Sequence, residues 1–183
     1  DTPGILTRTV ADAVFGFESI DSKCRHSAKK IRARDLNQVR IGVTRDYFWE
    51  KCQDDIAAIV ENTIAELVDG GATSVAVSMQ EAYEAVEVMA GGIIAASEGY
   101  EFLTNELPGW ADTLHPFISG RMNTGRDSLA LDYMTARRRV QELWLRADAQ
   151  LAEVDVLAVP TVPITPPIVS DVEDTESYIT ANM

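Results

Sequence analysis

The stretch "VRIGVTRDYFWEKCQDDIAAIVENTIAELVDGGATSVAVS", residues 39–78, determines the fold expected for this chain. Its two ends, 39–44 and 73–78, are short runs rich in β-branched residues, and each predicts a strand. A helical pattern separates them. Because parallel strands need such a crossover, we expect the two strands to pair in parallel around a right-handed βαβ unit. The sequence therefore predicts an α/β fold.

The helix between these strands is predicted from apolar residues at steps of three or four, which are Ile56, Ile59, Val60, Ile64, Leu67 and Val68. Asp54 or Asp55 is expected to cap its first turn. Gly70 and Gly71 follow the last apolar residue, and glycine readily takes the left-handed conformation that ends a helix.

Beyond this unit the chain is predicted to be mainly helical. Residues 79–103 favour two helical stretches that meet near Gly91 and Gly92, and residues 105–117 hold two prolines and predict a loop. A longer helix is expected from Ser128 onward, with an inward face formed by Leu129, Tyr133, Ala136, Val140, Leu143, Ala147 and Leu151.

Residues 154–159 are nearly all apolar and predict a central strand buried on both faces. Pro160 should end it, because proline has no N–H for the ladder.

The N-terminal residues predict a helix over 10–20, with Thr9 as its cap. The polar and basic residues 22–35 predict a surface connector. Only a Pro-Gly turn precedes the helix, so we expect the chain to be part of a longer protein.

Composition excludes several classes of function. The formal net charge is −13, from 16 basic and 29 acidic residues, which argues against nucleic acid as a partner. No apolar run reaches the roughly 18 residues of a membrane span. Cys24, Cys52, His26 and His115 match no metal-ligand spacing, so we expect reduced structural thiols, no metal, no cofactor and a cytoplasmic location.

A catalytic apparatus is not recognisable in the sequence. No glycine pattern opens a helix after a strand, and no Gly-x-Ser-x-Gly turn occurs. Cys24 and His26 are two residues apart in a polar segment. We expect this pair to have no catalytic role, in preference to acting as a nucleophile and its base. We therefore expect no catalytic residue within 1–183.

Two charged residues stand out by their apolar or small neighbours. Glu98 follows an apolar run, so its carboxylate is expected either to be paired or to face a pocket. Arg121 lies in "ISGRMNTG", interpreted as a loop entering a helix, and its guanidinium suits the carboxylate of a substrate or of a neighbouring side chain.

Several stretches, taken together and in order, resemble the amidase signature family. The first, "DTPGILTRTVADAV", has the family's Asp, nearby Gly, basic-Thr pair and V-x-D-A pattern. The others are "VRIGVTRDYF" with its helix and "GGATSVAV", then "IIAASEGYEFL", "RMNTG…LDYMTARRRVQEL", "VDVLAVPTVPITPP" and "YITANM".

This resemblance implies a mixed, mostly parallel sheet flanked by helices. Residues 1–183 would be a single α/β region, the C-terminal part of an amidase domain without its upstream catalytic core and last segment. The family hydrolyses a small carboxamide through an acyl-serine intermediate, with a Ser, a cis-peptide Ser and a Lys that match no position here. The chain alone is expected to be inactive and to associate with the remainder of its own amidase domain. Formation of a homodimer is left open.

The resemblance also implies roles for individual residues. Arg121 matches a position close to the substrate carboxylate in glutamine-using members, and Thr161 lies where loops border the active-site cleft. Tyr133, Ala136 and Arg139 match helix-packing positions.

Two alternatives stay open at this point. One is the A-type subunit of a glutamine-dependent tRNA amidotransferase, although Ala181 stands near the place of an acid in those subunits. The other is a non-catalytic, acidic α/β interaction module.

Overall fold

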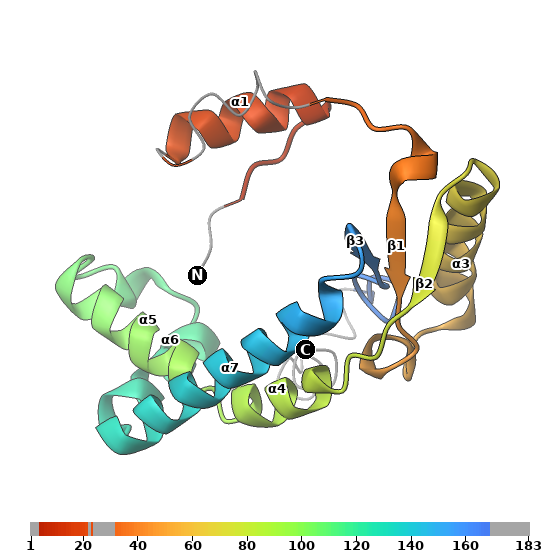
Figure 1. The fold of residues 1–183 in the computed structure, drawn as a ribbon. Coiled ribbons are helices and arrows are strands. Elements are labelled where there is room, and N and C mark those ends of the chain that lie inside the picture. The colour runs from red at the N-terminus through yellow and green to blue at the C-terminus, as the bar shows by residue number, and fades with distance from the viewer. Residues whose placement is uncertain (1–3, 22, 24–31, 169–183) are drawn as a thin grey trace. The chain divides into compact units, whose positions relative to one another are not determined.

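The computed structural model describes residues 4–21, 23 and 32–168, and the chain divides into two compact units, Asp1–Asp35 and Leu36–Met183 (Figure 1). The first unit contains helix α1, Val10–Ile20. The hydroxyl oxygen of Thr9 accepts a hydrogen bond from the backbone N–H of Asp12 at 3.1 Å, so the predicted helix and its cap are confirmed. Most of the predicted connector 22–35 lies outside the described residues.

The second unit is built on a three-stranded parallel sheet with the order β2-β1-β3. The strands are β1 (Arg40–Val43), β2 (Thr73–Ala76) and β3 (Val156–Ala158). Helix α3, Asp54–Asp69, connects β1 to β2 and lies beside them (Figure 1). The predicted βαβ unit and the α/β class are therefore confirmed.

Among the strands that the structure describes, β3 lies at an edge of the sheet and not at the centre, where its apolar run predicts it. Among the described strands it pairs only with β1, in register from Ile41 opposite Val156, and the Val156 side chain is 52% exposed. The central position belongs to β1, where Ile41 is 2% exposed. An apolar run indicates that a strand is suited to burial. The order of the strands in the sheet depends instead on which strands pair with each other.

Helix α3 begins one residue earlier than predicted. Gln53 is its N-cap, and Asp54 and Asp55 lie within the first turn, where a negative charge is favourable at the positive end of the helix dipole. Its end is as expected, because Gly71 has a φ of 112°, which a side chain would strain.

The helices that follow are α4 (Glu81–Ala90), α5 (Ile93–Asn105), α6 (Pro116–Asn123) and α7 (Ala130–Leu151). The predicted break between the first two is confirmed at Gly92, which has a φ of 66°. Among the described residues, no helix is both long enough and apolar enough to cross a lipid bilayer.

Helix α6 is a correction to the predicted loop. Pro116 occupies its first turn, where the missing N–H costs nothing, and His115 Nδ1 accepts a hydrogen bond from Phe117 N at 3.3 Å. Helix α7 likewise begins at Ala130, because Ser128 closes the 3₁₀ turn η5, Thr124–Asp127.

Helices α4 and α7 lie side by side and are joined by charged groups (Figure 1). Glu81 is 5% exposed and accepts a hydrogen bond from Gln150 Nε2 at 2.8 Å. Arg146 Nη2 lies 3.1 Å from Glu81 and 2.8 Å from Glu84, and its hydrogen bond lowers the pKa of Glu84. The inward face predicted for α7 is confirmed at the buried Leu143, whereas Leu129 is exposed.

Candidate functional site

The candidate site is formed where α5 and α6 meet. Helix α5 packs against η5 because Gly125 has no side chain; a Cβ there would overlap the carbonyl oxygen of Ala96. The same contact keeps α6 next to α5, and Pro108, Gly109 and Ala111 of the segment after α5 line the space beside the two helices. Two cavities lie at this junction.

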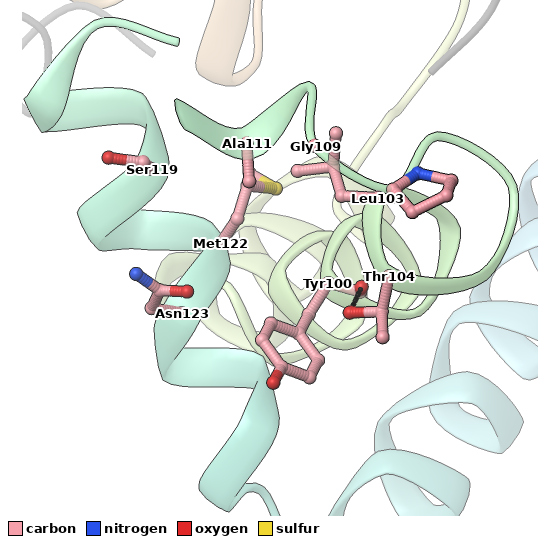
Figure 2. Close-up of a pocket in the computed structure, with 9 residues that line it drawn as sticks. Tyr100, Leu103, Thr104, Gly109, Ala111, Ser119, Met122 and Asn123 are labelled. Atoms are coloured by element: carbon pink, nitrogen blue, oxygen red, sulfur yellow. Dashed lines mark hydrogen bonds between the residues drawn. The ribbon is translucent and has the colours of Figure 1, made fainter. Parts of the chain in front are cut away.

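The larger cavity has a volume of about 350 Å³ (Figure 2). Its lining residues are Tyr100, Leu103, Thr104, Pro108, Gly109, Ala111, Ser119, Met122 and Asn123. None of them is charged. The hydroxyl of Thr104 donates to Tyr100 O at 2.7 Å, and the hydroxyl of Ser119 donates to Pro116 O at 3.1 Å. The cavity therefore presents carbon together with uncharged polar groups, of which the Thr104 and Ser119 hydroxyls already donate within their own helices. We call it the Tyr100 cavity.

The smaller cavity, of about 200 Å³, contains Arg121. Its lining residues are Ala90, Gly91, Gly92, Ala95, Ala96, Arg121, Met122 and Thr124. Arg121 lies in the last turn of α6, not in a loop, and its guanidinium carbon is 5.9 Å from the centre of the Phe117 ring. We call this the Arg121 cavity; small side chains leave room beside a cation.

Thr161 lies elsewhere. It is exposed, follows β3, and does not line either cavity. Its loop is tied to the start of α3, because Gln53 N donates to Pro163 O at 2.8 Å and Gln53 Oε1 accepts from Thr165 N at 2.9 Å. Neither of these two cavities therefore contains both Arg121 and Thr161.

The Glu98 carboxylate is paired, which is one of the two roles predicted for it. The hydroxyl of Tyr133 donates to Glu98 Oε1 at 2.8 Å, and this bond raises the pKa of Tyr133. Arg137 Nη1 lies 3.6 Å from the same oxygen. Because the carboxylate joins α5 to α7 and is half exposed, its role here is to hold the two helices together.

The helix-packing positions on α7 also have definite contacts. Tyr133 and Ala136 are half-buried, and Arg139 pairs with Glu84 on α4 and with Glu142 at 3.1 Å.

A polar cluster at the carboxyl edge of the sheet was missed by the sequence reasoning. Asp46 Oδ2 accepts hydrogen bonds from Met79 N at 2.6 Å and Ser78 Oγ at 3.1 Å, and the Met79 bond lowers the pKa of Asp46. Tyr83 donates to Glu50 and accepts from Tyr47 N at 2.9 Å. The position of Asp46 directly after a predicted strand was the available signal, since polar groups at strand ends often border sites.

In the part of the chain that the structure describes, no group of three or more His, Cys, Asp or Glu residues is placed to hold a metal ion. Cys52 is a free thiol whose pKa is raised by burial and by the nearby Asp55. Cys24 and His26 lie outside the described residues.

Comparison with known proteins places the whole chain in one family. The sequence profile of the family described as Amidase matches residues 1–183. A 2-amino-5-chloromuconic acid deaminase from Comamonas testosteroni is 31% identical over 183 residues, which cover 100% of this chain and 39% of that protein. The A-type subunit of the glutamyl-tRNA(Gln) amidotransferase from Chromobacterium violaceum is 34% identical over 89 residues, covering 43% of this chain and 18% of that protein.

The fold comparison agrees with the sequence comparison. The K. lactis urea amidolyase superposes with a TM-score of 0.63 and 19% identity, covering 79% of this chain and 9% of that one. The chain spans less than two fifths of the length of both curated relatives named above. The resemblance found in the sequence is confirmed: the chain belongs to the amidase family.

Proposed function

We propose that residues 1–183 form the substrate-pocket part of an amidase that hydrolyses a carboxamide C–N bond. The observation that carries this proposal is the family match over the entire chain, together with the Arg121 cavity. In the proposed reaction a serine outside 1–183 attacks the amide carbon, ammonia leaves with a proton, and water cleaves the resulting ester to the free acid. The second serine and the lysine of the triad are also proposed to lie outside this chain.

Arg121 is proposed to hold a carboxylate of the substrate. A guanidinium pairs with a carboxylate through two parallel hydrogen bonds, and the small residues around Arg121 leave the space for such a group. The Phe117 ring beneath the guanidinium supports its orientation. The Comamonas relative is named for an acid as its substrate, which favours the same assignment.

Thr161 is proposed to contact the substrate from the loop that follows β3. It follows the carboxyl end of β3, the edge at which parallel sheets bind ligands. Gln53 and Thr165 hold this loop, so the hydroxyl of Thr161 would be presented by a positioned backbone.

The remainder of the amidase domain is the proposed partner of the exposed apolar surface. Helix α7 and the residue before it carry exposed apolar side chains at Leu129, Leu131, Met134, Trp144 and Leu145. A groove of about 600 Å³ runs along the same helix beside Trp144, and Val156 is exposed on β3. Apolar surface of this extent favours a protein interface, and the chain amounts to 39% of its Comamonas relative. Homodimer formation and a cytoplasmic location stay predictions.

A second candidate is the A-type subunit of a glutamine-dependent tRNA amidotransferase. The 34% identity with the Chromobacterium protein favours it. In that case the ammonia would pass to a partner protein instead of being released. Stable ammonia transfer to such a partner, with glutamine as the donor, would distinguish the two candidates.

The test uses the full-length protein and its release of ammonia from paired substrates, one amide with a distal carboxylate and one without. Arg121→Ala should raise KM for the carboxylate-bearing amide roughly 10- to 100-fold, with a smaller change in kcat, because a charge-assisted hydrogen bond is lost. The KM for the uncharged amide should stay the same.

Arg126→Ala is the matched control, since Arg126 pairs with Asp127 on the surface of η5. It should leave both KM values unchanged. Equal changes in KM for the two amides in Arg121→Ala would mean that Arg121 has a structural role and does not bind the substrate carboxylate. No turnover of any amide by the full-length protein would contradict the amidase proposal and favour the non-catalytic module.

A further inference from the structure

We propose that the Tyr100 cavity and the Arg121 cavity form one acyl-binding site divided by Met122, and that Met122, seated against Gly99, determines the size of the neutral, apolar part of the acyl group that is accepted. This inference rests on the proposed amidase function and goes further, because it assigns a second ligand cavity and a specificity-determining side chain.

The first step is the continuity of the two cavities. Met122 is the residue that lines both of them. Figure 2 shows its side chain rising from α6 among Ser119, Ala111 and Gly109, on the border of the Tyr100 cavity. A residue that borders two cavities separates them while its side chain stays in place, joins them when it is shortened, and occupies their space when it is pushed toward them.

The second step is the seat of Met122. Gly99 lies in the middle of α5, where glycine costs about 1 kcal/mol relative to alanine, so a glycine there needs a packing reason. The reason is local: a Cβ at Gly99 would overlap Met122 Sδ. Gly99 therefore forms a notch in α5 that receives the thioether. Methionine has three rotatable bonds and fills such gaps adaptably, so an obstructed Met122 can swing without breaking the helix.

The third step is the chemistry of the ligand. The Tyr100 cavity has no charged lining residue, and the hydroxyls of Thr104 and Ser119 already donate to backbone carbonyls. A charged group buried there would lose hydration without compensation. Among the other lining residues, Leu103, Pro108 and Ala111 fit an alkyl or aryl group, and the Tyr100 phenol and the Asn123 amide are polar but uncharged. The charged guanidinium belongs to Arg121, which lines the cavity on the other side of Met122. The site thus suits an acyl group with a neutral, apolar part in the Tyr100 cavity.

The experiment measures kcat/KM of the full-length protein for primary amides of increasing size, from acetamide to hexanamide and phenylacetamide. Met122→Ala joins the cavities and should raise the hexanamide-to-acetamide ratio about tenfold, the usual selectivity of a few methylenes in an apolar pocket. Gly99→Ala pushes the thioether out of its notch and should lower the same ratio by a similar factor.

Gly120→Ala is the control on α6, because nothing lies within 4 Å of a Cβ at Gly120. It should leave the ratio unchanged. Ratios that stay the same in both Met122→Ala and Gly99→Ala would overturn the proposal. A third variant, Ala111→Phe, would also overturn the proposal if it lowered kcat/KM equally for all amides and lowered the melting temperature. That result would mean that another part of the protein fills the Tyr100 cavity.

A binding measurement separates this inference from the proposed function. If the full-length protein hydrolyses no amide, the amidase proposal fails, and the cavity is tested by saturation-transfer NMR with phenylacetamide. Binding that Ala111→Phe abolishes and Gly120→Ala retains supports the cavity assignment by itself. Absence of binding to the unmodified protein overturns it.

Discussion

Gln53 and Thr165 are 112 positions apart, yet Gln53 Oε1 accepts hydrogen bonds from both the backbone N–H and the hydroxyl of Thr165, at 2.9 and 3.3 Å. The backbone N–H of Gln53 also donates to Pro163 O at 2.8 Å. The N-cap residue of α3 therefore also holds the loop after β3. Only the side-chain oxygen is used in the contacts with Thr165, so the acceptor role can be tested separately from the size of the side chain.

Gln53→Leu should destabilise the protein by about 1 kcal/mol, the usual contribution of a hydrogen bond, and should speed amide exchange at Thr165. Gln53→Glu keeps an acceptor oxygen and places a negative charge at the start of α3, so exchange at Thr165 should stay slow. Hydrogen–deuterium exchange resolved to the 161–168 peptide is the measurement. Equal exchange in the two variants would show that the side-chain oxygen does not hold the loop.

Gly125→Ala should be strongly unfavourable, because its Cβ would overlap the backbone of α5 at Ala96 and Ser97, which cannot move aside. We expect a loss of about 1–3 kcal/mol or a failure to fold. Gly120→Ala, in a helix and facing open space, should instead be neutral or stabilising by about 0.5 kcal/mol. Chemical denaturation of both variants checks the contrast, and a tolerated Gly125→Ala would mean that η5 and α5 are not in close contact.

Glu81→Ala should cost about 2 kcal/mol, because it removes the acceptor of Gln150 and one carboxylate facing Arg146. The Glu81 side chain is 6% exposed, so water cannot replace these contacts easily. Glu87→Ala on the exposed side of the same helix is the control and should leave the melting temperature unchanged. A melting temperature equally insensitive to both substitutions would contradict the pairing of α4 with α7.

Asp46 should make the protein acid-sensitive. Its pKa is lowered in the folded state, chiefly by the hydrogen bond from Met79 N. The stability it contributes is therefore complete above the unfolded carboxyl pKa of about 3.9 and is lost as the pH falls through the lower folded value. Asp46→Asn should flatten the fall in melting temperature below about pH 4.

Ser78→Ala removes only one donor to Asp46 and should retain most of that pH dependence. An unchanged acid profile in Asp46→Asn would mean that the carboxylate does not hold the connection between β2 and α4.

The βαβ unit was predictable because its signals are local. Strand segments with β-branched residues, one helical pattern and the glycine pair at Gly70 and Gly71 all lie within residues 39–78, and each restricts the backbone where it stands. The parallel pairing of β1 with β2 follows from the helical crossover between them. The long helix α7 was predictable for the same reason.

Helix α6 was missed because its sequence has no helical periodicity. Eight residues with a proline and a glycine do not form a stable helix in isolation, where short helices are marginal. The helix exists because His115 caps it and because Met122 packs into the notch at Gly99 on α5. Both the helix and the cavities beside it depend on that contact.

Residue type alone was enough to select Arg121 as a candidate for carboxylate binding and Glu98 as a residue in need of a partner, since a charge among small or apolar neighbours must be compensated. Family and fold class were likewise readable from motifs along the chain. The position of β3 at the sheet edge, the two cavities around Met122 and the tie between Gln53 and Thr165 were decided in three dimensions. They arise from contacts between segments far apart in sequence, and no local pattern encodes which surfaces will meet.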